Sequence, residues 1–430
     1  MTTAAEPESL LLQMLDPAAR ADPYPLYRRI REQGPVHLPG KNLAVFSSYA
    51  DCDEVLRHPS SASDRMKSTV AQRAVADGAQ ARPFGPPGFL FLDPPDHTRL
   101  RRLVSKAFVP KVVNALEPEI VGLVGGLLRD AGDGGTFDAI AGLAYPLPVA
   151  VICRLLGVPL EDEPEFSAAS GLLAQSLDPF VSVTGAAGDG FEERMQAALW
   201  LREYLRELIS RRRRDPGDDL MSGLIQVEES GDQLTEDEIV ATCNLLLVAG
   251  HETTVNLIAN AILALLRDRS QWSALAADPG RVGAVIEETL RYDPPVQLVG
   301  RVAGEDMTIG GERSDGGNVI GGERSDGEAI TVPKGDNMLL LTAAAHRDPD
   351  AVERPDQFDP DRGTIRHLGF GKGPHFCIGA PLARLEASVA LTALTARFPD
   401  AVLAAEPVYK QNVTLRGMAT LDLENLGPTA

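Results

Sequence analysis

Cysteine is scarce in this sequence, which contains four in 430 residues. They stand at positions 52, 153, 243 and 377, far apart and without the paired spacing of a zinc site. A disulfide framework is also excluded as the basis of the fold, because such frameworks repeat cysteines closely in a short chain. We therefore expect most of these cysteines to be ordinary packed or surface residues.

Positive charge is also in short supply, since 41 basic residues face 61 acidic ones and the formal net charge is −20. A protein whose main partner is nucleic acid needs a basic surface, so that class is excluded. Long apolar runs near the N-terminus are missing too. The cluster at residues 10–15 is short and flanked by acids, which excludes a signal peptide or membrane anchor there. We expect a cytoplasmic protein with no membrane contact.

The hydrophobic pattern predicts a mainly α chain with a smaller β portion. Residues 23–33 have the pattern of a short amphipathic helix, and residues 36–47 that of a small hairpin. Residues 64–87 are rich in glycine, proline and alanine without a period, which predicts a long mobile loop. Helical spacing fills most of residues 96–292, and short strand-like runs follow over residues 296–341.

An eight-residue sequence is duplicated within the strand-like part. Residues 309–316 recur unchanged as residues 320–327. Two copies are too few for a solenoid, so we interpret residues 309–327 as a duplicated hairpin insert. No Pro/Ser-rich linker divides the chain, and we expect one domain over residues 1–430 with a short mobile N-terminus over about residues 1–20.

One cysteine stands in a distinctive setting. Residues 370–379 read Phe-Gly-Lys-Gly-Pro-His-Phe-Cys-Ile-Gly, and a helical pattern follows from Ala380. The glycines permit a tight turn and close approach by a flat group, while the helix start offers free amide donors to the sulfur of Cys377. Both the amides and the helix dipole favour a thiolate. A haem-thiolate ligand is one interpretation, and a buried free cysteine beside a glycine turn is the other.

The string Phe-Gly-x-Gly-x-His-x-Cys-x-Gly closely resembles the haem-binding signature of the cytochrome P-450 family. The resemblance implies a single-domain cytochrome P-450 fold in which haem b, iron protoporphyrin IX, lies between a long central helix and the cysteine loop. It implies that Cys377 is the axial ligand of the iron and that Phe370 contacts the haem.

A second group of chemical residues lies in the expected central helix, residues 245–262, which is apolar almost all round. A His-Glu-x-x-His zinc motif is excluded because position 255 is valine. Thr253 bonding back to its own helix is a purely structural alternative. The segment Ala249-Gly250-x-Glu252-Thr253 resembles the oxygen-activation segment of the family. The resemblance gives Thr253 the hydroxyl role and Glu252 the proton relay, with Ala249 and Gly250 against the haem.

The haem propionates call for cationic donors. His97 and Arg101 stand four residues apart on one predicted helix face and resemble the family's propionate-binding pair. Arg301 and His375 also match family positions, although each of these residues taken singly is more often a solvated surface group.

Glu288 and Arg291 match a structural lock that the family commonly completes with an arginine in a Pro-x-x-Phe segment. Here Gln357 takes that place, which puts the three-way network in doubt. The possible replacements are Arg354, Arg362 and His367.

The leading hypothesis is a haem-dependent monooxygenase, either a hydroxylase or an epoxidase. The resemblance implies an apolar substrate, a monomer, and electrons from a ferredoxin and a ferredoxin reductase. It places the pocket walls at residues 64–92, 172–183, 247–249, 296–299 and 415–418. A local basic patch is predicted to dock an acidic ferredoxin, and it comprises Arg99, Arg102, Lys106 and Lys111. The alternatives are a haem-binding sensor or carrier without turnover, and an oxygen-independent rearrangement catalyst.

Overall fold

The computed structural model describes residues 7–82, 85–131, 135–184, 190–229, 234–310, 329–424 and 427. Helices dominate it, as predicted. Their bounds are α1 Pro7–Met14, α2 Tyr24–Arg31, α3 Tyr49–Arg57, α4 Thr69–Ala76, α5 Asp96–Ser105, α6 Pro110–Ala115, α7 Glu117–Asp130, α8 Pro146–Leu156, α9 Glu163–Ala174, α10 Phe180–Thr184, α11 Phe191–Arg214, α12 Leu220–Glu229, α13 Glu236–Gly250, α14 Glu252–Arg267, α15 Arg269–Ala277, α16 Val282–Tyr292, α17 Thr342–Ala345 and α18 Ala380–Arg397.

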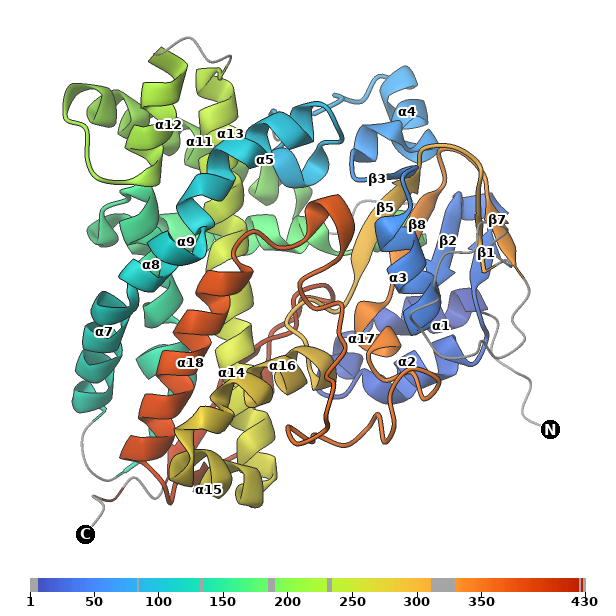
Figure 1. Cartoon of the computed structure of the whole chain (residues 1–430). Helices are drawn as coiled ribbons and strands as arrows, with labels where there is room; N and C mark the ends of the chain where they lie inside the picture. The colour runs from blue at the N-terminus through green and yellow to red at the C-terminus, as the bar shows by residue number, and fades with distance from the viewer. Residues whose placement is uncertain are drawn as a thin grey trace.

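The centre of the molecule is built on α13 and α14, and α18 lies beside α14 (Figure 1). Thr235 and Glu238 form a capping box that starts α13. Every residue of α14 from Thr254 to Leu266 is buried. Among the described residues, one helical stretch, Glu236–Arg267, is long and apolar enough to cross a membrane, but 67% of its apolar window is buried inside the fold. Its apolar character is therefore explained by its place in the core.

A small mixed sheet lies to one side of this helical core (Figure 1). Its strand order is β1 (Val36–Leu38), β2 (Leu43–Phe46), β8 (Asn337–Leu340), β5 (Val299–Ala303) and β3 (Ser61–Ala62). The β2–β8 pair is parallel and the others are antiparallel, with Arg301 of β5 opposite Met338. The shorter pairings join β6 (Met307–Ile309) to β7 (Ile330–Val332), β10 (Val408–Tyr409) to β11 (Met418–Thr420), and β12 (Asp422–Glu424) to β4 (Phe137–Asp138) and β9 (Val402–Leu403).

Residues 7–20, where the sequence predicts a mobile N-terminus, have regular structure and pack against the fold. They form α1 and the short turn Pro17–Arg20. Leu10, Leu11 and Met14 are at most 2% exposed and belong to the cluster that also holds Tyr27 and Ile30 of α2. The short apolar run anchors this segment, because its side chains complete a core next to the sheet.

Residues 64–87 are also more regular than the sequence indicates. They contain the short turn η3 (Arg65–Lys67) and the helix α4, whose first turn is capped by the Ser68 hydroxyl accepting from the Ala71 amide at 3.1 Å. The duplicated segment, residues 309–327, lies outside the described residues except for Ile309 and Gly310. Its flanking strands β6 and β7 do pair as an antiparallel hairpin.

Candidate active site

The cysteine loop, residues 370–379, is a tight turn that is closed by a hydrogen bond of its own backbone. The Cys377 amide donates to the Phe370 carbonyl at 2.8 Å, which closes the loop just before α18. Gly371 and Gly373 have φ of +69° and +67°. A Cβ on Gly373 would lie 2.8 Å from the Leu56 carbonyl oxygen of α3, so only glycine fits there.

The surroundings of the Cys377 sulfur act on its pKa in opposite directions. Burial raises the pKa of the thiol, whereas the amides of Gly379 and Ala380 and the charges of Arg101 and Arg384 lower it. The predicted amide donors are therefore present. These amides favour the thiolate, as the sequence predicts, while burial acts in the opposite direction.

The central helix is interrupted at the position where the sequence predicts chemistry. α13 ends at Gly250 and α14 begins at Glu252, so the long helix is not continuous. Two backbone carbonyls next to the break are bonded to side chains. The Thr253 hydroxyl donates to the Ala249 carbonyl at 2.8 Å, and the His251 ring contacts the Leu247 carbonyl at 2.6 Å.

The same stretch of helix has one open face. Ala249 is exposed although its neighbours Leu246 and Leu247 are buried, and Thr253 is half-buried. Ala249 and Thr253 stand four residues apart, so the accessible side of this stretch is the one that carries Thr253. A Cβ on Gly250 would lie 3.1 Å from Ile152 of α8, so Gly250 permits helix packing on the other side.

Glu252 has a partner that sequence reasoning missed. Lys410, next to β10, lies 2.8 Å from its carboxylate, and the two side chains are 28% and 14% exposed. The side chain of Asn256 donates to the same carboxylate at 3.5 Å. Glu252 and Thr253 are thus adjacent in sequence, but Glu252 bonds to Lys410 beside β10 and Thr253 bonds to Ala249 of α13. A lone lysine 158 residues away carries no local signal that would reveal the pair.

The four predicted propionate residues form one cluster. His97 of α5 stacks against His375 of the cysteine loop with ring centroids 4.1 Å apart. Arg101 donates to the Phe376 carbonyl, which ties α5 to the loop. Burial, then the charges of Arg301, His97 and Arg101, lowers the pKa of His375 to about 3, and burial lowers the pKa of Arg301 to about 10. The cluster is therefore short of negative charge.

This cluster fits a dianionic group. Both ring nitrogens of His97 and Nδ1 of His375 are buried without a hydrogen-bond partner in the described part of the chain. The negative charge of Asp93 raises the pKa of His375, but Asp93 already forms an ion pair of 2.8 Å with Lys67. Unpaired buried donors carry a desolvation cost that two carboxylates would remove. The donor set, the nearby Cys377 and the open face at Ala249 together suit a haem.

The lock around Glu288 is complete, contrary to the doubt raised by Gln357. Arg291 binds Glu288 through two hydrogen bonds of 2.7 and 2.8 Å, and both side chains are 0% exposed. Arg362 supplies the third member, with Nε 3.0 Å from the same carboxylate. Position 357 contributes its backbone carbonyl, which accepts from Arg291 and Arg362, so the network does not require an arginine side chain there.

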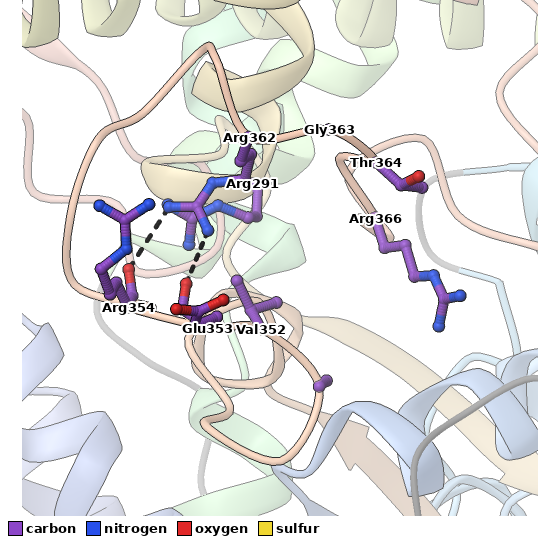
Figure 2. Close-up of a pocket in the computed structure, with 9 residues that line it drawn as sticks. Arg291, Val352, Glu353, Arg354, Arg362, Gly363, Thr364 and Arg366 are labelled. Carbon is purple, nitrogen blue, oxygen red and sulfur yellow. Dashed lines mark hydrogen bonds between the residues drawn. The ribbon is translucent and has the colours of Figure 1, made fainter.

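A cavity of about 340 Å³ opens beside this network. In Figure 2, Arg362 donates to the carbonyls of Glu353 and Arg354 on one side of this cavity. Arg366 lies on the other side. The residues lining it include four arginines and no predicted site residue. It is therefore separate from the candidate active site.

Comparisons with known proteins agree with this geometry. A family model for cytochrome P-450 matches residues 32–278 and 282–403. The ligand-free crystal structure of CYP164A2 from Mycobacterium smegmatis is 67% identical, with a TM-score of 0.89 over 97% of this chain and 100% of that one. The myxobacterial CYP267B1 in complex with myristic acid is 34% identical, with a TM-score of 0.81 over 96% of this chain and 98% of that one.

A curated relative agrees as well. The vitamin D(3) 25-hydroxylase of Pseudonocardia autotrophica is 38% identical over 95% of this chain and 94% of its own length. The predicted resemblance is thereby confirmed, together with the mainly α cytochrome P-450 fold. The chain belongs to the cytochrome P-450 family and is a haem-iron monooxygenase of that family.

Proposed function

We propose that this monooxygenase inserts one atom of dioxygen into a C–H or C=C bond of an apolar organic molecule, using haem b and electrons from an external ferredoxin and its reductase. The observation that carries the proposal is the cluster of His97, His375, Arg101 and Arg301, short of negative charge, beside Cys377. We further propose that residues 1–430 act as one domain, as a monomer, in the cytoplasm.

The roles of the residues follow from their positions. A haem with a thiolate ligand supplies the activation and cleavage of dioxygen. Cys377 binds the iron, and the histidine and arginine cluster binds the propionates. Phe370 holds the cysteine loop closed through its carbonyl, and its ring lies under Arg384 at 4.5 Å from the guanidinium carbon. Ala249 leaves room for the macrocycle on the open face of α13.

Proton delivery is assigned to the pair that interrupts the central helix. Cleavage of dioxygen with release of water consumes two protons. The Thr253 hydroxyl donates its hydrogen to the Ala249 carbonyl, so its oxygen can accept a hydrogen bond on the accessible face of the helix. Glu252 relays protons taken up from solvent to this region, and Lys410 fixes the position of its carboxylate.

Replacement of Thr253 by alanine is expected to leave substrate affinity unchanged while product formed per electron pair falls about tenfold or more, because protons and oxygen are no longer held in place. The electrons would appear as hydrogen peroxide or water. Oxygen uptake, peroxide and product are measured together. The matched control is Thr254→Ala, since Thr254 is buried and its hydroxyl donates to the Gly250 carbonyl of its own helix. Equal coupling in both variants would remove Thr253 from the mechanism.

An apolar substrate is supported by the names of the relatives. They include a vitamin D(3) 25-hydroxylase, a 6-deoxyerythronolide B hydroxylase, and solved structures in complex with myristic acid and with testosterone. Several relatives are named as hydroxylases or monooxygenases, which favours turnover over the role of a sensor or carrier.

The predicted docking patch needs one correction. Arg99 pairs with Glu238 and lies 3.8 Å from Asp96, so its charge is already neutralised by acidic side chains of this protein. Arg102, Lys106 and Lys111 are exposed, and Val109, Val112 and Phe376 expose apolar side chains beside them. We define these six residues as the docking patch. It adjoins the cysteine loop, because Arg101 binds the Phe376 carbonyl.

Charge reversal in the docking patch is expected to slow electron transfer. In the double variant Arg102→Glu/Lys106→Glu, reduction by ferredoxin should fall about tenfold or more at low salt, because an acidic partner is no longer attracted. The difference should shrink as salt screens the charges. Stopped-flow reduction measures this, with Arg129→Glu on α7 as an exposed control. An unchanged rate and salt dependence would contradict the proposed docking site.

A further inference from the structure

Arg65 occupies an unusual position in the first turn after the sheet edge. Its guanidinium carbon lies 4.7 Å from the centre of the Phe91 ring, and its Nη1 donates to the Ser176 carbonyl at 3.3 Å. Phe91 belongs to the turn η4 (Phe89–Phe91) and Ser176 to the turn η8 (Gln175–Leu177). Arg65 therefore connects two segments that the family resemblance assigns to the walls of the substrate pocket.

The side chain of Arg65 keeps accessible surface although part of it is removed from water. Arg65 is exposed, as is Ala249 on the open face of α13. Yet burial lowers the pKa of Arg65, as for a group that has lost water on most sides. The two facts agree if the guanidinium faces an internal cavity. The half-buried side chains of Met66, Phe91 and Leu92 in the same segment make that wall apolar.

The charge of Arg65 has no acidic partner among the described residues. The neighbouring Asp64 accepts from the Met66 amide at 2.9 Å and lies 3.8 Å from Arg82 instead. The propionate cluster does not provide a counter-charge for Arg65 either. The pKa of His375 is lowered by the charges of Arg301, His97 and Arg101, whereas no charged group within the described ranges shifts the pKa of Arg65. A cation that is partly removed from water and has no counter-ion among the described residues is costly, so it indicates an anion that arrives with a ligand.

We propose that Arg65 binds the carboxylate of the substrate, and that this monooxygenase therefore acts on apolar carboxylic acids. The inference rests on the function proposed above and narrows its substrate class. The carbonyl of Ser176 and the face of Phe91 occupy one side of the guanidinium, which leaves an edge of N–H groups that matches a carboxylate in two parallel hydrogen bonds. A single cation suits a monoanion better than a phosphate dianion.

Equilibrium binding to the haem-loaded protein tests this proposal. Saturated acids from octanoate to hexadecanoate are compared with the alcohols of equal chain length, by calorimetry and by the substrate-induced shift of the haem spectrum. We expect wild type to bind the best acid about 10-fold to 100-fold more tightly than its alcohol, the range for a hydrogen-bonded charge pair. Arg65→Leu and Arg65→Gln should lose this preference without weaker binding of the alcohol, and Arg65→Lys should keep part of it.

Arg73→Leu is the matched control, because Arg73 on the neighbouring α4 is exposed and bonds to Asn42 at the surface. Wild type without an acid preference, or Arg65 variants that weaken acid and alcohol equally, would overturn the inference. So would a loss of bound haem in the Arg65 variants, which would assign Arg65 to a propionate. A wild-type protein with a normal haem-thiolate spectrum and no acid preference leaves the proposed function standing. Lack of that spectrum would overturn the proposed function as well.

Discussion

Replacement of Cys377 by alanine is expected to abolish monooxygenase activity, with a loss on the order of a thousandfold or more, as for other residues on which the chemistry depends. The sulfur is the one soft anionic ligand that the cysteine loop offers, and thiolate ligation is what directs a haem toward cleavage of the O–O bond. The overall fold should survive, because the loop is held by the backbone hydrogen bond from residue 377 to Phe370, which alanine retains.

The control for this variant is Cys153→Ala, a buried thiol of α8. We expect it to keep both the haem spectrum and turnover, at a stability cost of about 1 kcal/mol for the lost sulfur. Product formation and the spectrum of the reduced, carbon monoxide-bound protein are measured for both variants. A red-shifted band that persists in Cys377→Ala would mean that another group ligates the iron.

The second large effect is expected on stability, from Glu288→Gln. The carboxylate of Glu288 accepts from Arg291, Arg362 and the Asp359 amide in a fully buried setting. The substitution leaves two arginines without their counter-ion, which costs about 3–5 kcal/mol when a buried pair is broken. Because ΔG of unfolding is typically only about 5–15 kcal/mol, the variant should unfold at much lower denaturant concentration.

Arg354→Gln is the matched control in the same loop. Arg354 lies at the surface, where it bonds to Gln357 and Asp359, and exposed ion pairs of this kind contribute about 1 kcal/mol or less. Urea unfolding followed by circular dichroism compares the two variants. If Glu288→Gln costs no more than Arg354→Gln, the buried network does not stabilise the fold as described.

The parts of the site that the sequence predicted are those written in short motifs. The cysteine loop depends on the left-handed glycines 371 and 373, and these angles leave a direct mark on the sequence. His97 and Arg101 share one face of α5 because four residues nearly complete a helical turn. The helical class and the β1–β2 hairpin follow from hydrophobic period and turn residues.

The parts that escaped prediction depend on contacts between distant segments. The pairing of Glu252 with Lys410 brings the central helix to a C-terminal hairpin, and no local pattern encodes it. Arg362 is one of the three replacements named from the sequence, but no local pattern selects it over Arg354 and His367, or indicates that Gln357 contributes its backbone carbonyl. Thr253 does bond back to its own helix, which is the structural alternative named from the sequence, but a hydrophobic period does not show that the helix breaks at His251.

The central claim is that Cys377 ligates a haem held by the histidine and arginine cluster. The spectrum of the reduced wild-type protein under carbon monoxide tests it most directly. We predict a main absorption band strongly shifted to the red, in an amount that matches the haem bound per chain. A band at the unshifted position of histidine-ligated haem, or no stoichiometric haem, would contradict the account.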